Sequence, residues 1–581
     1  MKRAALVLAF LTTMCAAVPT PKPIPTIDHL SLDEKIGQLF SVPARGVFMS
    51  ESSPSYQKLV HHVRDNHVGG FIWFLSNVYE TALLNQRLQD ASRVPLLISA
   101  DLEAGVGMRF ADTTFWPSAM AIAATGEPGL AEEEGRVAAR EARALGVNHI
   151  LAPVADVNVD PDNPVINVRS FGEDPADVSR YVAAFVRGVQ GEHVLATAKH
   201  FPGHGDTHVD SHRSLPMLDV TRERLGRVEL VPFRAAIEAG VGSIMVGHLA
   251  VPSVDPTLAP PRALADEDRP YGTPESEIAK NGTMPATTSP KIVGELLRRD
   301  LHYDGLVVTD AFDMGGITER FDPGEGAVRA IEAGVDEVLM STDTDAAIAA
   351  VKAAIKSGRL TVGRIDESVR RLLAAKQFAG APVAHPDEIF RVIDSQEHRE
   401  LAGRIARKAL TLVREEPAVL PLKRETRVVL VNVSDFPELA NPLPDFEREL
   451  RRHLQSSLQV TTIDSRSLQA EAEGVVRAGE GADVVVVALA VRARSGAGRL
   501  AVPDVARAMI GRIGKPVIVI SFGSPYALRE IPNVKTYLCA YGIQPVMQMA
   551  AVAALFGETE ITGRLPVTIP GLHSRGEGIR R

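Results

Sequence analysis

The chain has 581 residues, of which 45% are hydrophobic and 23% are charged. This length exceeds one ordinary hydrophobic core and predicts at least two domains. The formal net charge of −9 at pH 7 excludes a broadly basic protein that binds nucleic acid or anionic lipid through its overall charge, and it favours a small substrate with little or no charge.

The first residues are typical of an export signal. Lys2 and Arg3 precede the apolar stretch Ala4–Leu11, and small residues follow up to Ala17. The apolar stretch is too short to cross a bilayer, so we expect a signal peptide over residues 1–17 that is cleaved after Ala17. The mature protein is then exported to the periplasm or the extracellular space, without a transmembrane segment.

Cys15 offers an alternative to simple cleavage. A lipoprotein would carry its acyl chains on this cysteine, but Met14 is a poor match to the small residue that usually precedes such a site. Once the signal is removed, only Cys539 remains, which predicts a mature chain with no internal disulfide.

Short apolar runs that alternate with amphipathic segments dominate the first part of the chain. Amphipathic segments such as Glu132–Leu145 and Lys291–Arg299 predict helices between the runs. Eight such units predict a (β/α)8 TIM barrel with insertions over residues 18–380, and an open doubly wound sheet is the alternative. The runs are Leu39–Val42, Val68–Phe74, Pro95–Asp101, Val147–Val157, Val194–Phe201, Val241–Leu249, Gly305–Asp310 and Gly334–Met340.

A second, smaller α/β sandwich domain is expected over residues 401–581. Its strand candidates begin at Arg427, Ala482, Lys515 and Thr536 and are separated by helical stretches. Residues 381–400 form the predicted linker.

One insertion stands out in the barrel. The polar segment Thr257–Asn281 reads as a long loop after the sixth strand, close to the expected site. It ends in a weak glycosylation sequon at Asn281.

The run from Lys199 to Pro216 carries the strongest chemical signal. It reads KHFPGHGDTHVDSHRSLP and follows a strand, and its proline and glycines oppose a helix at its start. Asp210 and His212 are two residues apart, so in an extended segment they would share a face and the carboxylate could bond the imidazole. Such a pair favours proton transfer near neutral pH.

Two other interpretations of this run stay open. His204, His208 and His212 recur at four-residue intervals, which on a helix would place three ligands for a metal such as zinc on one face. A polar loop with only a structural role is the third interpretation.

Polar residues also follow the other predicted strands. In a barrel, the carboxyl ends of the strands converge on one site, so these residues are expected to lie together. They are Asp101, Arg169, Lys199, His200, the Asp210–His212 loop, His248 and Asp310.

Four motifs resemble glycoside hydrolase family 3, and in particular its NagZ-type β-N-acetylglucosaminidase branch. In the order of that family, the chain has INVRSFGEDP, AKHFPGHGDTHVDSH, PATTSPKIVGELLR and GLVVTDAFDM, and the likeness extends from about Leu30 to Pro570. The histidine loop is the most specific of the four, because relatives that act on simple glucosides generally lack its Asp–His pair.

This resemblance implies a role for each matching residue. Asp310 would be the nucleophile that forms a covalent glycosyl-enzyme, and His212 would be the acid/base with Asp210 as its partner. Asp313 is the rival for Asp310, but it lies three residues beyond the strand end. The residues that would hold the sugar are Asp101, Arg109, Arg169, Lys199, His200 and His248.

Two details of the sequence depart from simple expectation. The third strand continues as DLEAGVGMR, which keeps Asp101, Glu103 and Arg109 but lacks the glutamine, one glycine and the first arginine of the branch's pattern DQEGGRVxR. The choice between muropeptide and chitin fragments is therefore open. In addition, Lys199 and His200 are adjacent and would diverge in a regular strand, so the strand must end there if both contact sugar.

Together with the export signal, the resemblance implies an exported, cofactor-independent retaining exo-glycosidase with no metal. Its partner would be a carbohydrate, from which it removes terminal β-linked N-acetylglucosamine; peptidoglycan and chitin fragments are the expected sources. The alternatives are a β-glucosidase or β-xylosidase of the same fold, a phosphorylase, and a non-catalytic wall-binding protein.

The first testable prediction concerns export. N-terminal sequencing of material recovered outside the cytoplasm should begin near Val18, because the charged start, short apolar core and small residues form a removable signal. An intact Met1 in the cytoplasmic fraction would contradict this, and a diacylated Cys15 would select the lipoprotein alternative.

Overall fold

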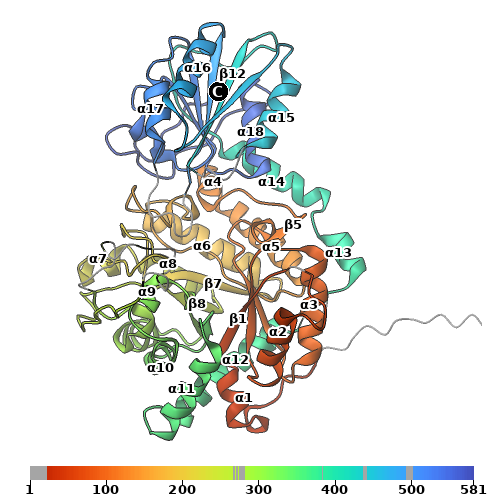
Figure 1. Cartoon of the computed structure of the whole chain (residues 1–581), viewed down its shortest axis with the longest axis vertical. Helices are drawn as coiled ribbons and strands as arrows, with labels where there is room; N and C mark the ends of the chain where they lie inside the picture. Colours follow the sequence, from red (N-terminus) through yellow and green to blue (C-terminus); the bar gives the residue numbers. More distant parts are fainter. Residues whose placement is uncertain are drawn as a thin grey trace, which may run out of the picture.

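The computed structural model describes residues 22–46, 48–265, 269, 273, 276, 282–381, 384–435, 441–492 and 501–581. The predicted signal peptide with Cys15 and the sequon at Asn281 lie outside these residues. Figure 1 shows a barrel of strands and helices with a smaller sheet domain above it. None of the helices in the described ranges has the length and apolar character needed to cross a membrane.

The lower domain is a nearly closed barrel of eight parallel strands. The order β10-β1-β2-β4-β6-β7-β8-β9 follows the chain around the barrel, and a bridge between Val308 and Glu337 joins the last two strands. Each strand matches one predicted run, so the barrel is confirmed. The strands are β1 (Phe40–Ala44), β2 (Gly70–Trp73), β4 (Leu97–Ala100), β6 (His149–Ile150), β7 (Leu195–Phe201), β8 (Ser243–Val246), β9 (Leu306–Thr309) and β10 (Val338–Leu339).

Helices surround these strands, which are buried because side chains pack against both faces. The predicted helices at Glu132–Leu145 and Lys291–Arg299 are confirmed as parts of α5 and η8, and η8 is wound as a π-helix. Asp174 caps α6 by accepting hydrogen bonds from two backbone N–H groups, as acidic caps do. The helices are α1 (Leu32–Gly37), α2 (Pro54–Arg64), α3 (Val78–Ala91), α4 (Ala119–Ala124), α5 (Pro128–Ala144), α6 (Pro175–Gln190), α7 (Arg222–Arg227), α8 (Val231–Glu238), η8 (Lys291–Asp300), α9 (Gly315–Thr318), α10 (Pro323–Ala333), α11 (Thr344–Lys356) and α12 (Val362–Ala379).

The upper domain contains a six-stranded sheet in the order β11-β16-β15-β14-β12-β13, in which only the β11–β16 pair is antiparallel. The four predicted strands are β12, β14, β15 and β16, whereas the edge strands β11 and β13 were missed. The strands are β11 (Thr411–Glu415), β12 (Val428–Ser434), β13 (Gln459–Ile463), β14 (Val484–Ala490), β15 (Val517–Ser521) and β16 (Thr536–Cys539), and the helices are α15 (Pro444–His453), α16 (Gln469–Glu480), α17 (Asp504–Ile510) and α18 (Pro545–Leu555).

Two helices occupy the predicted linker. They are α13 (Pro386–Val392) and α14 (Gln396–Ala409), and α14 runs across residue 401, where we expected the second domain to begin. Helix α14 packs on α4 and α5 of the barrel and on α18 of the second domain. The boundaries at 380 and 401 therefore stay a prediction.

Loops at the carboxyl ends of the second sheet contact loops of the barrel. After β6, Asn158 donates a hydrogen bond to the Tyr526 hydroxyl over 3.0 Å. After β4, Ser118 donates to the Tyr541 carbonyl, also over 3.0 Å. The side of the second sheet where ligands usually bind in open α/β folds thus faces the barrel.

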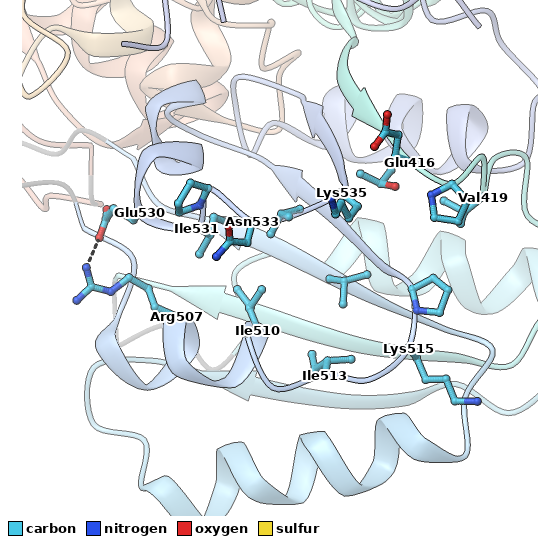
Figure 2. Close-up of a pocket in the computed structure, with 17 residues that line it drawn as sticks. Glu416, Val419, Arg507, Ile510, Ile513, Lys515, Glu530, Ile531, Asn533 and Lys535 are labelled. Carbon is cyan, nitrogen blue, oxygen red and sulfur yellow. Dashed lines mark hydrogen bonds and ion pairs between the residues drawn. The ribbon is translucent and has the colours of Figure 1, made fainter. Parts of the chain in front are cut away.

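The second domain also has a hollow at the opposite, amino-terminal ends of β15 and β16. This cavity has a volume of about 320 Å³. Figure 2 shows that apolar side chains such as Ile510 and Ile513 line it and that Lys515 borders it. An ion pair between Arg507 and Glu530, 3.1 Å apart, closes one side. None of the candidate site residues from the sequence lines this hollow.

Candidate active site

Seven of the nine candidate site residues line one cavity of about 600 Å³ at the carboxyl ends of the barrel strands. The eighth, Asp210, lies behind His212, and the ninth, His248, supports a loop nearby. The structure therefore brings together side chains that are up to 209 residues apart in the chain, which is the difference between 310 and 101. The seven are Asp101, Arg109, Arg169, Lys199, His200, His212 and Asp310.

A network of charged side chains forms one wall of the cavity. Lys199 Nζ lies 2.7 Å from Asp101 Oδ1 and 2.7 Å from Glu103 Oε1. Arg109 pairs with Asp101 at 2.6 Å, and Arg169 pairs with Glu103 through two bonds of 2.8 Å. Three cations thus hold two carboxylates in fixed positions.

These ion pairs determine the charge state of the wall. Burial alone would raise the pKa of Asp101, but Lys199 and Arg109 outweigh that effect and hold it well below its usual range. Burial likewise opposes ionisation of Glu103, and Arg169 and Lys199 reverse the effect and lower its pKa. Both carboxylates are therefore ionised at neutral pH and can accept hydrogen bonds from hydroxyl groups.

Adjacent residues Lys199 and His200 both line the cavity because the strand is irregular at this point. The pairing of β7 with β8 shifts register between Ala198 and Phe201. The regular alternation of side chains is therefore interrupted where the strand ends, as both contacts require.

Asp156 forms hydrogen bonds to His200 and His204, and the sequence analysis did not predict this role. Its carboxylate accepts from His200 Nδ1 at 2.8 Å and from the His204 backbone N–H at 2.7 Å. The residue is fully buried. Asp156 lies inside the apolar run Val147–Val157. A charged residue within a run that was predicted to be core could have identified it.

Asp310 follows β9 directly. Its backbone N–H donates to the Val246 carbonyl over 2.9 Å, and its Oδ1 accepts from the Ala311 N–H at 2.8 Å. Burial would raise its pKa, but the neighbouring His200, His248 and His212 rings lower the pKa below its usual value. Asp310 is therefore an ionised carboxylate at the edge of the cavity.

The predicted bond between Asp210 and His212 is present, although its geometry differs from our expectation. Asp210 Oδ1 accepts from both the backbone N–H and Nδ1 of His212, each over 2.9 Å. This is a turn closed by the aspartate side chain, and not an extended segment, because short polar side chains readily bond the backbone two residues on. With Nδ1 held by the buried carboxylate, Nε2 is the nitrogen that can exchange a proton.

Two backbone hydrogen bonds join the His212 loop to the segment after Asp310. The Gly315 N–H donates to the His212 carbonyl at 2.9 Å, and the Gly316 N–H donates to the Ser211 carbonyl at 3.0 Å. A Cβ on Gly315 would lie 2.2 Å from the Arg213 carbonyl oxygen, so only glycine allows this approach. These bonds thereby fix the position of His212 relative to Asp310.

The metal interpretation of this loop requires a helix that does not form. Residues 202–214 make turns, and the three histidines bond different partners. His204 contacts Thr207 and Ser211, while His208 is 78% exposed and pairs with Asp160. Together with the Asp210 bond of His212, these contacts do not gather the three rings at one point.

His248 does not line the cavity, unlike seven of the other candidate residues. Its Nδ1 bonds the Thr287 hydroxyl at 2.9 Å and its Nε2 bonds the Ala311 carbonyl at 3.0 Å. Both ring nitrogens thus have protein partners, and His248 steadies the residue that follows Asp310. Asp313, the rival of Asp310, does line the cavity, and burial raises its pKa.

Two arginines that the sequence reasoning did not select complete the lining. Arg45 follows β1, and Arg492 follows β14 of the second domain. A residue more than 100 positions beyond the barrel could not be assigned to the cavity from sequence, because its position depends on how the two domains pack.

Comparison with known proteins decides the family. The model of the glycosyl hydrolase family 3 N-terminal domain matches residues 31–375, and that of the family 3 C-terminal domain matches residues 410–576. The chain belongs to glycoside hydrolase family 3.

Relatives in this family have more than one activity. A β-N-acetylglucosaminidase/β-glucosidase of Cellulomonas fimi is 32% identical over 93% of this chain and 94% of its own length. A solved family 3 β-N-acetylglucosaminidase of Paenibacillus sp. is 33% identical, with a TM-score of 0.77 over 93% of this chain and 99% of that one. The solved β-glucoside phosphorylase BglX is 27% identical, with a TM-score of 0.78 over 94% of each chain.

The charged wall yields the second prediction. Lys199→Met should lower the free energy of unfolding by about 3–5 kcal/mol at pH 7, because it leaves two buried carboxylates short of a partner. The folded-state pKa values of Asp101 and Glu103 are lowered, so their ion pairs add stability above the unfolded pKa of about 4 and lose it as the pH falls. The difference between the two proteins should therefore shrink below pH of about 4.

Urea unfolding at several pH values measures this difference. Lys408→Met is the matched control, because its 2.6 Å ion pair with Glu127 is exposed at both ends. The control should cost at most about 1 kcal/mol. Equal losses for both variants, or a loss at Lys199 that does not vary with pH, would contradict the ionised network.

Proposed function

We propose that this chain is an exported retaining exo-glycosidase that removes terminal β-linked N-acetylglucosamine from peptidoglycan or chitin fragments. The observation that carries the proposal is the pairing of an ionised strand-end aspartate, Asp310, with an aspartate-bound histidine, His212, in one cavity. The names of the relatives from Cellulomonas fimi and Paenibacillus sp. support N-acetylglucosamine as the sugar.

In the first step, an oxygen of Asp310 attacks the anomeric carbon of the terminal sugar. The bond from that carbon to the leaving oxygen breaks, and His212 transfers its Nε2 proton to this oxygen. A water molecule then attacks the same carbon while His212 takes a proton from it, and the bond to Asp310 breaks. Two inversions return the original β configuration.

The charged wall is suited to hold the terminal sugar during these steps. Asp101 and Glu103 offer ionised oxygens to sugar hydroxyls, and Lys199 keeps them fixed at 2.7 Å. Because the cations are already paired in the free protein, the array needs little rearrangement when substrate binds. We assign Arg109, Arg169 and His200 to the same sugar subsite.

A phosphorylase is the second candidate, and the likeness to BglX favours it. In that reaction phosphate replaces water in the second step and yields a sugar 1-phosphate. Arg45 and Arg492 line the same cavity and carry positive charge that suits a phosphate. A β-glucosidase or β-xylosidase would use the same two residues with a different sugar, and a non-catalytic wall-binding protein would use neither.

The third prediction separates these reactions. Nitrophenyl β-N-acetylglucosaminide should be cleaved faster than the matched glucoside and xyloside, because we assign the subsite to the acetamido sugar. In phosphate buffer the product should be free N-acetylglucosamine. Formation of the sugar 1-phosphate only when phosphate is present would establish the phosphorylase, and binding of fragments without turnover would contradict both enzymes.

The fourth prediction tests the roles of Asp210 and His212. His212→Ala should slow cleavage of a disaccharide by about 10²–10⁴-fold while slowing nitrophenyl substrates much less, because only a poor leaving group needs a proton in the first step. Asp210→Ala should act in the same direction, since it removes the carboxylate that holds Nδ1 of His212 and orients the ring.

His208→Ala is the control for this loop, because its side chain is exposed and pairs with Asp160 outside the cavity lining. It should leave both substrate classes unchanged. Equal losses on both substrate classes in the His212 and Asp210 variants would show that the proton donor lies elsewhere.

A further inference from the structure

A second cluster of chemically active side chains lies on the outer surface of the barrel, away from the catalytic cavity. His61 and His62 are in the last turn of α2, and Asp345 is in the first turn of α11. Figure 1 shows both helices on the barrel below the second domain. One ligand atom of each residue lies within 4.8 Å of the other two, and none of the three lines the cavity.

The side-chain amide of Asn66 marks the centre of this cluster. Its Nδ2 lies 2.8 Å from Asp345 Oδ1, 3.0 Å from His62 Nδ1 and 3.4 Å from His61 Nε2. Three ligand atoms therefore converge on one point, which an N–H group with partial positive charge now fills. For a cation to take this point the amide has to move aside, and its oxygen can then turn toward the cation as a fourth ligand.

An outer carboxylate orients His61 toward the same point. Asp65 Oδ2 lies 2.8 Å from His61 Nδ1, so the opposite ring nitrogen, Nε2, faces Asp345 at 3.0 Å. Metal-binding histidines almost always bond a carboxylate, a carbonyl or water through the nitrogen that does not bind the metal. The arrangement of Asp65, His61 and the central point has this pattern.

The chemistry of the ligands selects the cation. Two imidazole nitrogens and a carboxylate oxygen suit zinc, whereas calcium and magnesium prefer oxygen ligands alone. His62 is 4% exposed, so the surrounding side chains hold its ring in place. We propose that His61, His62 and Asp345 form a structural zinc site on the barrel, with Asn66 or water as the fourth ligand.

The site would join the first and last β–α units of the barrel. Helix α2 follows β1 and helix α11 follows β10, and these two strands are neighbours in the sheet. A tetrahedron with bonds of 2.0–2.1 Å needs ligand atoms about 3.3 Å apart. The 3.0 Å contact between His61 and Asp345 therefore has to open slightly, and the other separations, which are within 4.8 Å, have to close to that spacing. Zinc there would hold together the seam where the barrel closes.

Zinc titration of the full chain without a polyhistidine tag tests the proposal. Calorimetry should detect one equivalent of Zn²⁺, and the melting temperature should rise with zinc. His61→Gln and Asp345→Asn should each weaken the affinity at least about tenfold, and Asp65→Asn, an exposed change beside the ligands, should weaken it by about 10–100-fold.

His385→Gln is the matched control, because His385 is a similarly exposed histidine beside an aspartate, Asp387. It should leave zinc affinity unchanged. Absence of zinc binding, or binding that survives the His61 and Asp345 changes, would overturn the site. Since the proposed hydrolysis uses no metal, turnover should persist in a strong chelator, so the two proposals fail independently.

Discussion

The chemistry of this protein depends on the two backbone hydrogen bonds that join Gly315 and Gly316 to the carbonyls of His212 and Ser211. The His212 loop leaves β7 and the Asp310 segment leaves β9, so neither strand alone fixes the distance between the two groups. The bonds require backbone to approach backbone, and the absent Cβ of Gly315 makes this possible. A proton donor and a carboxylate from different strands are thereby held as one unit.

In the charged wall of the cavity, ion pairs between side chains hold the groups in place, whereas backbone hydrogen bonds do so at His212 and Asp310. Lys199 is 2% exposed and contacts two carboxylates, each of which has an arginine of its own. Lys199 is buried and the other four charged groups are largely withdrawn from water, which is favourable only because each one has a partner of opposite sign. The result is an array of hydrogen-bond acceptors that exists before substrate arrives, while Asp310 and His212 carry out the reaction beside it.

Much of this could be predicted from sequence. The eight apolar runs and their polar ends predicted the barrel and six of the seven cavity residues, because strand ends of a parallel barrel must converge. Arg109 was implied only by the family resemblance. The turn geometry of Asp210 and His212 could not be predicted, since it depends on one side chain bonding a backbone N–H two residues on. The role of Asp156 was not predicted because its neighbours in the sequence are apolar. The position of Arg492 at the cavity could not be predicted because it depends on how the two domains pack. The edge strand β13 was missed because QVTTI is half exposed and lacks an apolar run.

The central claim is that Asp310 bonds covalently to the sugar while His212 moves the proton. Mass spectrometry of peptides from enzyme treated with a 2-fluoro sugar that carries an activated leaving group tests it most directly, because fluorine slows release of the intermediate. The account predicts one sugar per chain, attached to Asp310. Attachment to Asp313 or to another residue, or turnover with no trapped sugar at all, would contradict it.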